Sequence, residues 1–260
     1  LTHDQGAYTP HSITVPYNSA SNLPGPYILP TYDLDVIVAR TNKPPVIPVR
    51  GAGNPQGAFA MERLLDLVAG RMGLDRAEVR RRNLIPADKM PYAVGLTNRG
   101  GGPVVYDSGD YATCQRKALD AVDYAGFPAR QAAAREQGRW IGIGFAHGLK
   151  CTGRGPFESA TVRVTPSGRV AVYTGALAMG QGLKTALAQI CADELGVSVE
   201  DIDVTCGDTS HVSLGLGGYG SRQTMLAGSS VQLAAGAVRE KALKVAAQML
   251  ASEKDLVLAD

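Results

Sequence analysis

A single arginine stands among glycines, just before a predicted helix, in the segment Val49-Arg50-Gly51-Ala52-Gly53-Asn54-Pro55-Gln56. At a helix N-terminus the backbone N–H groups point outward, and the helix dipole adds partial positive charge. Gly51 and Gly53 would let the backbone approach a ligand closely, while Asn54 is a preferred N-cap residue. The segment therefore suits an anionic or oxygen-rich ligand. A glycine turn that merely precedes a well-capped helix would show the same pattern.

Two further glycine-rich segments lead into predicted helices. The first runs over 175–185 and contains Gly180-Gln181-Gly182, and the second runs over 215–223 and contains Gly220-Ser221. Three such entrances indicate one large anionic ligand held at several points, since a single phosphate would need only one. Gln181 could either donate to that ligand or cap the helix that follows. A P-loop would need a contiguous Gly-Lys-Thr, and Leu183 interrupts that order, so nucleotide binding of the P-loop type is the weaker alternative.

Other polar side chains are interpreted as structural. His147 and His211 have the pattern of ordinary surface or core histidines, and Glu158, which precedes a predicted strand, is interpreted as a surface carboxylate. The four cysteines lack the C-x-x-C spacing of iron–sulfur or zinc sites, so no metal ligand is predicted in this chain. Reduced cysteines fit a cytoplasmic protein. The cysteines are Cys114, Cys151, Cys191 and Cys206.

The composition is that of an ordinary globular protein, with 45% hydrophobic and 19% charged residues in a chain of 260. That length suits one large domain or two ordinary ones. The net charge of +2 gives no general attraction to nucleic acid or membrane, and Arg80-Arg81-Arg82 is interpreted as a solvated helix end. No apolar run reaches the roughly 20 residues that a membrane span requires.

The elements that would position the glycine segments follow from hydrophobic periodicity and turn residues. Asp75 and Glu78 resemble a capping box, residues 86–110 are expected to form loops, and a boundary is placed at 138. The first helix is expected to bury Phe59, Leu64, Leu65, Val68 and Met72 and to end at Gly73. Helices are predicted at 55–72, 75–82, 111–122, 129–137, 182–195 and 224–250. Strands are predicted at 36–39, 141–145, 159–164, 169–173 and 202–205, which gives the second part a β-β-β-α-β-α order.

An ordered set of motifs resembles the molybdopterin-binding large subunit of the xanthine dehydrogenase/aldehyde oxidase family, the molybdenum hydroxylases. The resemblance covers nearly the whole chain, in the family's order and with sensible spacing. The matching segments are Asp4-Gln5-Gly6-Ala7-Tyr8, Arg50 to Gln56, Glu62-Arg63, Arg80 to Leu84, Met179-Gly180-Gln181-Gly182, Gly207-Asp208-Thr209 and Gly220-Ser221-Arg222.

The resemblance implies an α+β (mixed α/β) fold of two molybdopterin-binding lobes that sandwich the cofactor. Residues 1–138 would belong to the first such domain and residues 139–260 to the second. The cofactor would be molybdenum-molybdopterin in its cytosine dinucleotide form. By the family's pattern Arg50 would be the catalytic residue beside the molybdenum. The cofactor-binding residues would be Arg50, Gly51, Gly180, Gln181, Gly182, Gly220 and Ser221.

The resemblance also implies an activity and partners. The enzyme would hydroxylate an aldehyde or N-heterocyclic carbon with oxygen taken from water. Electrons would leave through 2Fe-2S and FAD groups on partner subunits or domains. The family's upstream glycine-rich segment and its C-terminal glutamate base are expected outside this chain, so it would be catalytically incomplete by itself. The alternative is a structural, cofactor-holding subunit without catalysis.

Two departures from the family pattern bear on the substrate. The loop position held by Ala52 carries phenylalanine in purine-oxidising members, so purine oxidation is not expected. The carbon monoxide-oxidising members carry a cysteine in this loop, and this chain has none there.

Overall fold

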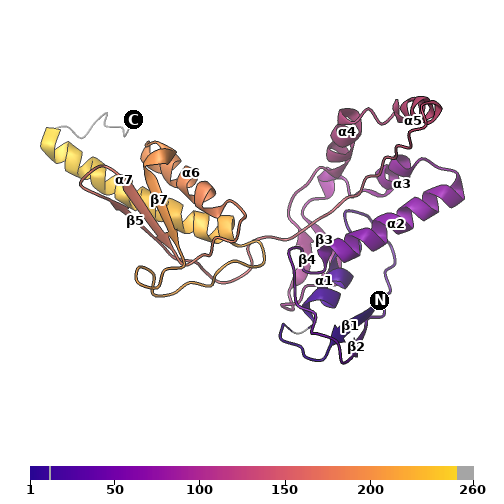
Figure 1. Ribbon diagram of the computed structural model, residues 1–260, viewed down its shortest axis with the longest axis horizontal. Coiled ribbons are helices and arrows are strands. Elements are labelled where there is room, and N and C mark those ends of the chain that lie inside the picture. The colour runs from indigo at the N-terminus through magenta and orange to yellow at the C-terminus, as the bar shows by residue number, and fades with distance from the viewer. Residues whose placement is uncertain (12, 251–260) are drawn as a thin grey trace. The chain divides into compact units, whose positions relative to one another are not determined.

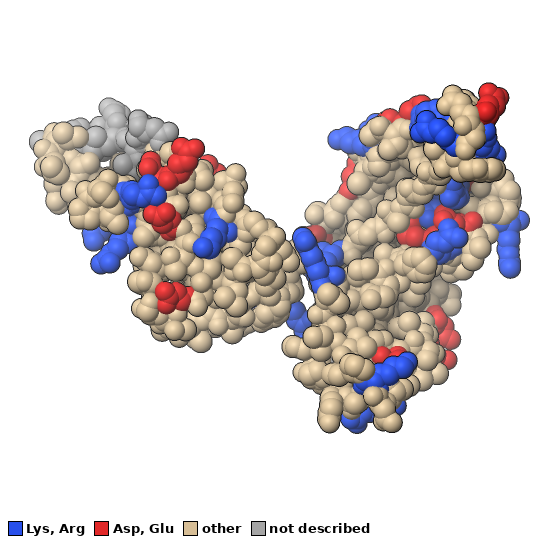
Figure 2. Space-filling view, viewed as in Figure 1, with Lys and Arg blue, Asp and Glu red and all other residues tan. Residues whose placement is uncertain are grey.

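The computed structural model describes residues 1–11 and 13–250, which form two compact units, Leu1–Lys150 and Cys151–Asp260 (Figure 1). Each unit has its own sheets, helices and buried core, and each is described by itself. On the face shown in Figure 2, acidic and basic side chains are interspersed over each unit. None of the helices in the described ranges is both long and apolar enough to span a membrane.

The first unit contains two small sheets. β1 (Thr2–Gly6) pairs in parallel with β2 (Ile37–Arg40), and β3 (Tyr92–Thr97) pairs antiparallel with β4 (Pro103–Tyr106). The prediction of loops over 86–110 was therefore wrong. The glycines at 100–102 form the turn of a hairpin, and the β3 side chains alternate between half-buried and exposed, as expected for a strand with one packed face.

The first unit also contains several helices. They are α1 (Thr14–Asn22), α2 (Asn54–Met72), α3 (Arg76–Asn83), α4 (Tyr111–Ala121) and α5 (Phe127–Glu136), with a short 3₁₀ turn, η1 (Ala87–Lys89). The predicted end of α2 is confirmed, because Gly73 adopts a left-handed conformation and its N–H donates to carbonyls of the last turn. Asp75 caps α3 by accepting from two backbone N–H groups. Glu78 pairs instead with Arg81 and Arg82, so a full capping box does not form.

The predicted buried face of α2 was wrong for Phe59, Leu64 and Met72, which are exposed, whereas Leu65 and Val68 are half-buried and Leu65 packs against the core. The fully buried positions are Gly57, Met61, Glu62 and Ala69. A Cβ on Gly57 would lie 2.6 Å from the Ser19 carbonyl oxygen of α1. Small residues therefore mark this face, because the backbones of α1 and α2 approach each other too closely for large side chains.

A buried charge network joins α2 and α3. The Arg80 guanidinium is fully buried and binds Glu62 at 2.6 Å and Asp66 at 3.0 Å. Tyr27 donates its hydroxyl to Glu62 at 2.6 Å. The interpretation of the arginine run as a solvated helix end was thus wrong for Arg80, although Arg81 and Arg82 are exposed. A glutamate on the helix face that packs against the core requires a buried cationic partner.

The predicted strand at 141–145 does not form. Residues 139–159 run without regular strand pairing, although Ile141 and Ile143 accept hydrogen bonds from the side chains of Gln131 and Arg76. An alternation of apolar and small residues does not form a strand when no neighbouring strand supplies backbone hydrogen bonds. The order of the second unit is therefore β-β-α-β-α.

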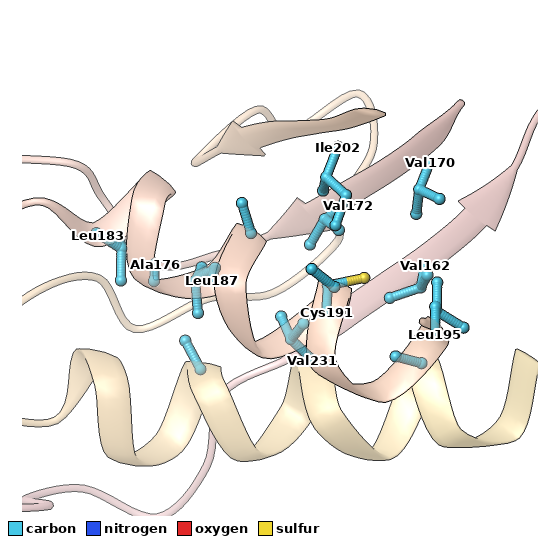
Figure 3. Close-up of a cluster of buried hydrophobic side chains, with 14 residues drawn as sticks. Val162, Val170, Val172, Ala176, Leu183, Leu187, Cys191, Leu195, Ile202 and Val231 are labelled. Carbon is cyan, nitrogen blue, oxygen red and sulfur yellow. The ribbon is translucent and has the colours of Figure 1, made fainter. Parts of the chain in front are cut away.

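The second unit is a three-stranded sheet covered by two helices. β5 (Ala160–Val164) and β6 (Val170–Thr174) form the predicted hairpin, and β7 (Ile202–Cys206) pairs in parallel with β6. α6 (Leu183–Leu195) and a 3₁₀ turn, η2 (Val199–Asp201), connect β6 to β7. A π-helical turn, η3 (Gln223–Ala227), leads into α7 (Gly228–Leu250). Figure 3 shows the core between sheet and helices, which includes Val170, Val172, Leu187, Cys191 and Val231.

Candidate functional site

In the second unit, two glycine-rich loops leave the same edge of the sheet. β6 and β7 are parallel and in register from Val170↔Ile202 to Thr174↔Cys206. The β6–α6 loop (175–182) and the β7–η3 loop (207–222) therefore both begin at the carboxyl ends of neighbouring strands. Ligands of α/β sheets commonly bind at this edge. The sheet topology thus brings together two of the three glycine segments identified in the sequence.

The two loops touch each other through backbone. A Cβ on Gly175 would lie 2.4 Å from the Gly215 Cα, and a Cβ on Gly215 would lie equally close to Gly175. The Gln223 side chain adds a second connection, because its amide Nε2 donates to the carbonyl of Leu177. Glycine is therefore required at both contact positions for the loops to adopt this arrangement.

The crest of the β6–α6 loop is open. Gly180 and Gly182 have φ values of +80° and +76°, and no atom lies within 4 Å of the place where a Cβ would stand on either. Gln181 is exposed and makes no hydrogen bond to described residues, so it does not cap α6. Gly182 is the N-cap residue and has no side chain to satisfy the first N–H groups of α6. Those N–H groups are available to a ligand.

Gly220 and Ser221 both adopt left-handed conformations, with φ of +58° and +56°. A Cβ on Gly220 would meet the Arg154 side chain at 2.8 Å. The carbonyl of Ser221 accepts from Gly153 N–H at 3.0 Å. Ser221 is exposed, and a non-glycine residue in this region carries backbone strain. Such strain persists only where the surrounding structure enforces it.

The residue that follows Ser221 belongs to a buried ion pair that the sequence interpretation missed. Arg222 and Glu158 are joined at 2.9 Å, and each side chain is 1% exposed. The interpretation of Glu158 as a surface carboxylate was therefore wrong. The two residues stand 64 positions apart, and no local pattern connects them. A carboxylate between a Gly-Pro turn and a strand could equally be solvated.

In the first unit, the third glycine segment forms a tight turn ahead of α2. Gly51, Ala52 and Gly53 have φ of +104°, +49° and +98°. Asn18 donates to the carbonyl of Ala52 at 2.8 Å and holds the turn against α1. Arg50 is exposed and makes no ion pair or hydrogen bond with described residues. Its guanidinium is free to meet a ligand.

The N-terminus of α2 differs from the prediction in its cap. Gly53 is the N-cap residue and Asn54 is the first helical residue, so the prediction of Asn54 as N-cap was wrong. Because Gly53 adopts the left-handed conformation, α2 begins one residue earlier than predicted. The Asn54 Oδ1 atom is buried and has no hydrogen-bond partner, and no side chain caps the helix. The Asn54 N–H already donates to the Gly51 carbonyl at 3.1 Å, and Pro55 has no N–H to offer. The polar atom that the described residues leave without a partner at this turn is therefore the Asn54 Oδ1 acceptor.

The histidines lie in different settings. His147 contacts Gln115 at 3.1 Å, and burial lowers the pKa of its imidazole. His211 stacks on Tyr173 at a ring distance of 4.2 Å. Residues 1–11 and 13–250 contain no group of three or more histidine, cysteine or acidic side chains placed to hold a metal. Cys114, Cys191 and Cys206 are free thiols, and burial raises the pKa of Cys191 to about 11.

Comparison with known proteins gives consistent matches along the chain. Residues 117–260 match a family model described as molybdopterin cofactor-binding domain, and residues 1–84 match another with the same description. Subunit gamma of the 6-hydroxypseudooxynicotine dehydrogenase complex of Paenarthrobacter nicotinovorans is 37% identical over 98% of this chain and 32% of its own length. The carbon monoxide dehydrogenase large chain of Hydrogenophaga pseudoflava is 40% identical, over 77% of this chain and 26% of its own.

A solved structure agrees with these matches. The crystal structure of quinoline 2-oxidoreductase from Pseudomonas putida 86 has a TM-score of 0.84 and 34% identity, and the match covers 100% of this chain and 34% of that one. The chain thus spans about a third of the length of the relatives it matches.

Proposed function

The chain belongs to the molybdopterin cofactor-binding family of the molybdenum hydroxylases, and we propose that it holds the molybdenum cofactor of an enzyme that hydroxylates a carbon of an aldehyde or N-heterocycle. The predicted family and the predicted α+β fold class are confirmed by the matches to family models and solved structures. The oxygen that is added would come from water. The relative that oxidises quinoline supports the N-heterocyclic branch.

The observation that carries this proposal is the open crest of the β6–α6 loop at the carboxyl edge of the sheet. A pterin with a pyrophosphate offers several anionic and polar groups. In the second unit, the uncapped N–H groups of α6 and the bare backbone at Gly180 and Gly182 suit close approach by such a ligand. In the first unit, the orphaned Asn54 Oδ1 offers a further acceptor beside the left-handed turn that follows Arg50. The residues present therefore fit the cofactor.

We assign roles to the candidate residues on that basis. Gly180, Gln181 and Gly182 would bind the pterin side of the cofactor, and Gly220 and Ser221 would pack beside the metal's ligands. Gly51 would contact the cofactor through its backbone, while the Pro55 ring fills the space on its Cβ side. When bound, the cofactor supplies a Lewis acid and a two-electron sink.

Arg50 would act on the developing charge of the reacting oxygen. Its guanidinium is exposed and unpaired among the described residues, and it is planar and always charged. Once held beside the reacting oxygen, such a cation would stabilise the transition state more than the ground state. Arg50 is the candidate catalytic residue of this chain.

The proposal extends to the cofactor form and the partners. We propose the cytosine dinucleotide form, with iron–sulfur and FAD subunits that receive the electrons and with a small-molecule substrate. Relatives named as a complex subunit and a large chain support assembly with other subunits. We propose a cytoplasmic location, which the free thiols of Cys114, Cys191 and Cys206 support.

The test is made on the native complex that contains this chain. Molybdenum is measured by mass spectrometry and cytosine nucleotide after acid release, each per polypeptide. We expect near-equal amounts of both, and turnover of an N-heterocycle or aldehyde with an artificial electron acceptor. A complex that contains neither molybdenum nor pterin contradicts the proposal. Molybdenum without turnover of either substrate class would favour the cofactor-holding alternative.

Arg50→Lys separates the catalytic role from cofactor loading. We expect turnover to fall by roughly 10²-fold or more, as when one preorganised donor is lost, while molybdenum content stays near that of the parent. Arg71→Lys, an exposed position at the other end of α2, is the matched control and should change neither. Equal loss of turnover and molybdenum in Arg50→Lys would assign Arg50 to cofactor loading instead.

A further inference from the structure

All three nitrogens of the Arg222 guanidinium donate hydrogen bonds to loop carbonyls of the second unit. Its Nε donates to the carbonyl of Arg154 at 3.0 Å, and its Nη1 donates to the carbonyl of Gly217 at 3.0 Å. Its Nη2 donates to the carbonyl of Phe157. The guanidinium also lies over the ring of Tyr219, 5.2 Å from its centre. Three carbonyls from two separate stretches of irregular chain are thus gathered by one side chain.

Glu158 completes the arrangement from the other side. One of its oxygens accepts from Arg222 at 2.9 Å and from Leu216 N–H at 3.3 Å. The other accepts from Ser159 N–H at 3.3 Å, at the entrance to β5. The pair therefore ties both the 154–158 segment and the 216–217 stretch of the β7–η3 loop to the edge of the sheet.

This pair lies beside the apolar core without being part of it. The buried apolar cluster of the second unit consists of side chains from the sheet, α6 and α7. Taking two charges out of water is costly, and a buried ion pair often adds little to net stability compared with neutral residues of similar size. Its hydrogen bonds go to loop backbone, which has no strand or helix ladder to hold it. The left-handed Gly220 and Ser221 immediately precede Arg222 in the chain.

We infer that Glu158 and Arg222 are positioning residues, whose buried ion pair holds the β7–η3 loop in the conformation that presents Gly220 and Ser221 to the cofactor. This inference rests on the proposed function for its ligand. The pair itself would not touch the cofactor, because both side chains are buried and their polar atoms are occupied by protein groups. It acts through the backbone of the loop.

The test separates positioning from stability by a pair of substitutions, made in the native complex. Arg222→Met alone leaves a buried carboxylate without its partner, so both stability and molybdenum content should fall. The double variant Arg222→Met with Glu158→Gln removes both charges, so the unfolding midpoint should recover much of the loss. The three carbonyl contacts remain lost in the double variant. Molybdenum affinity should therefore stay roughly 10- to 100-fold below the parent, the range for outer groups that orient a metal site.

The matched control is the exposed pair formed by Arg169 and Asp203, at 3.0 Å, in the same unit. Arg169→Met with Asp203→Asn should change neither molybdenum content nor midpoint appreciably. A double variant at 158 and 222 that regains both midpoint and molybdenum content overturns the inference, because the pair would then be merely structural.

Hydrogen–deuterium exchange of the 215–221 amides supplies a readout that needs no cofactor. Exchange in this stretch should be faster in the Arg222 double variant than in the parent, while exchange in the β6 amides should be unchanged. Unaltered exchange in 215–221 overturns the inference even if molybdenum is lost. A parent complex without molybdenum contradicts the proposed function alone, and the exchange result still decides whether the pair holds the loop.

Discussion

Among the described residues, each unit buries one arginine–glutamate pair, and the two pairs do different things. Arg80 of α3 binds Glu62 and Asp66 of α2, so in the first unit the pair joins two regular helices. The Arg80 guanidinium also lies over the ring of Phe145, 4.6 Å from its centre. Arg222 in the second unit donates hydrogen bonds to loop carbonyls as well as to Glu158. The chemistry of the two pairs is the same. What each arginine holds shows whether it serves the fold or a site.

The largest expected effect is on the first pair. Arg80→Met leaves Glu62 without its buried cation, and we expect the free energy of unfolding of the first unit to fall by about 3–5 kcal/mol. Molybdenum per folded polypeptide should be unchanged, in contrast to the loss expected for Arg222 variants. Thermal unfolding with exchange mass spectrometry measures both units separately. Arg82→Met, at an exposed position, is the control, and a similar molybdenum loss in Arg80→Met would erase the distinction between the pairs.

Substitutions of glycine should also distinguish positions that serve the fold from positions that serve the site. A Cβ on Gly53 would lie 2.2 Å from the Val15 carbonyl oxygen, at a φ of +98°. We expect Gly53→Ala to lower the free energy of unfolding by about 3 kcal/mol through overpacking and strain. The measurement is denaturant unfolding of the native complex. Gly73→Ala, which has a left-handed conformation but no atom within 4 Å of its Cβ position, controls for strain alone, and an equal loss there would remove the packing argument.

Gly180 should show the reverse behaviour. Its Cβ position is open, so Gly180→Val should cost only about 1–2 kcal/mol of stability from its positive φ. The side chain would nevertheless occupy the space in which we place the cofactor, and molybdenum content should drop sharply. Metal analysis beside a thermal melt tests this. A folded Gly180→Val protein with full molybdenum content would remove Gly180 from the binding surface.

The smallest expected effect concerns pH and the first unit. Burial lowers the pKa of His147, so the folded state favours the neutral ring more than the unfolded chain does. The contribution of His147 to the free energy of unfolding is therefore complete above its pKa in the unfolded chain, near 6.5, and is lost as the pH falls below that value. The unfolding midpoint should decrease between about pH 7.5 and pH 5.5, and His147→Gln should reduce that decrease. An identical pH response in His147→Gln would assign the effect to other groups.

The elements with strong local signals were predicted well. The turn Pro166-Ser167-Gly168 between two alternating runs predicted the β5–β6 hairpin. The glycine at position 73 predicted the end of α2, and the structure confirms it with a left-handed cap. The buried face of α2 was not predictable from apolar periodicity. It is marked by Gly57 and Ala69, because it packs backbone against backbone, while Phe59 points outward.

The candidate site was predictable only in its loops. The three glycine segments followed from composition and turn chemistry, whereas the sheet edge that brings two of them together is visible only in the strand pairing of the structure. The ion pair of Glu158 and Arg222 could not be predicted, because its two residues are distant in sequence and burial decides its role. The assignments of Arg50, Gly51, Gly180, Gln181, Gly182, Gly220 and Ser221 to the cofactor remain proposals that the experiments above address.

The contact between Gly175 and Gly215 has a consequence for how this unit can change over generations. Either position would have to move the backbone of the other to accept even a methyl group. A mutation at one cannot be rescued by a smaller residue at the other, since both are already the smallest available. Substitutions at the base of the two loops should therefore be rare, both in natural variation and in laboratory selection. At Gly180 and Gly182 no atom lies within 4 Å of the Cβ position, so new ligand preferences can be sampled there at a small cost to the fold.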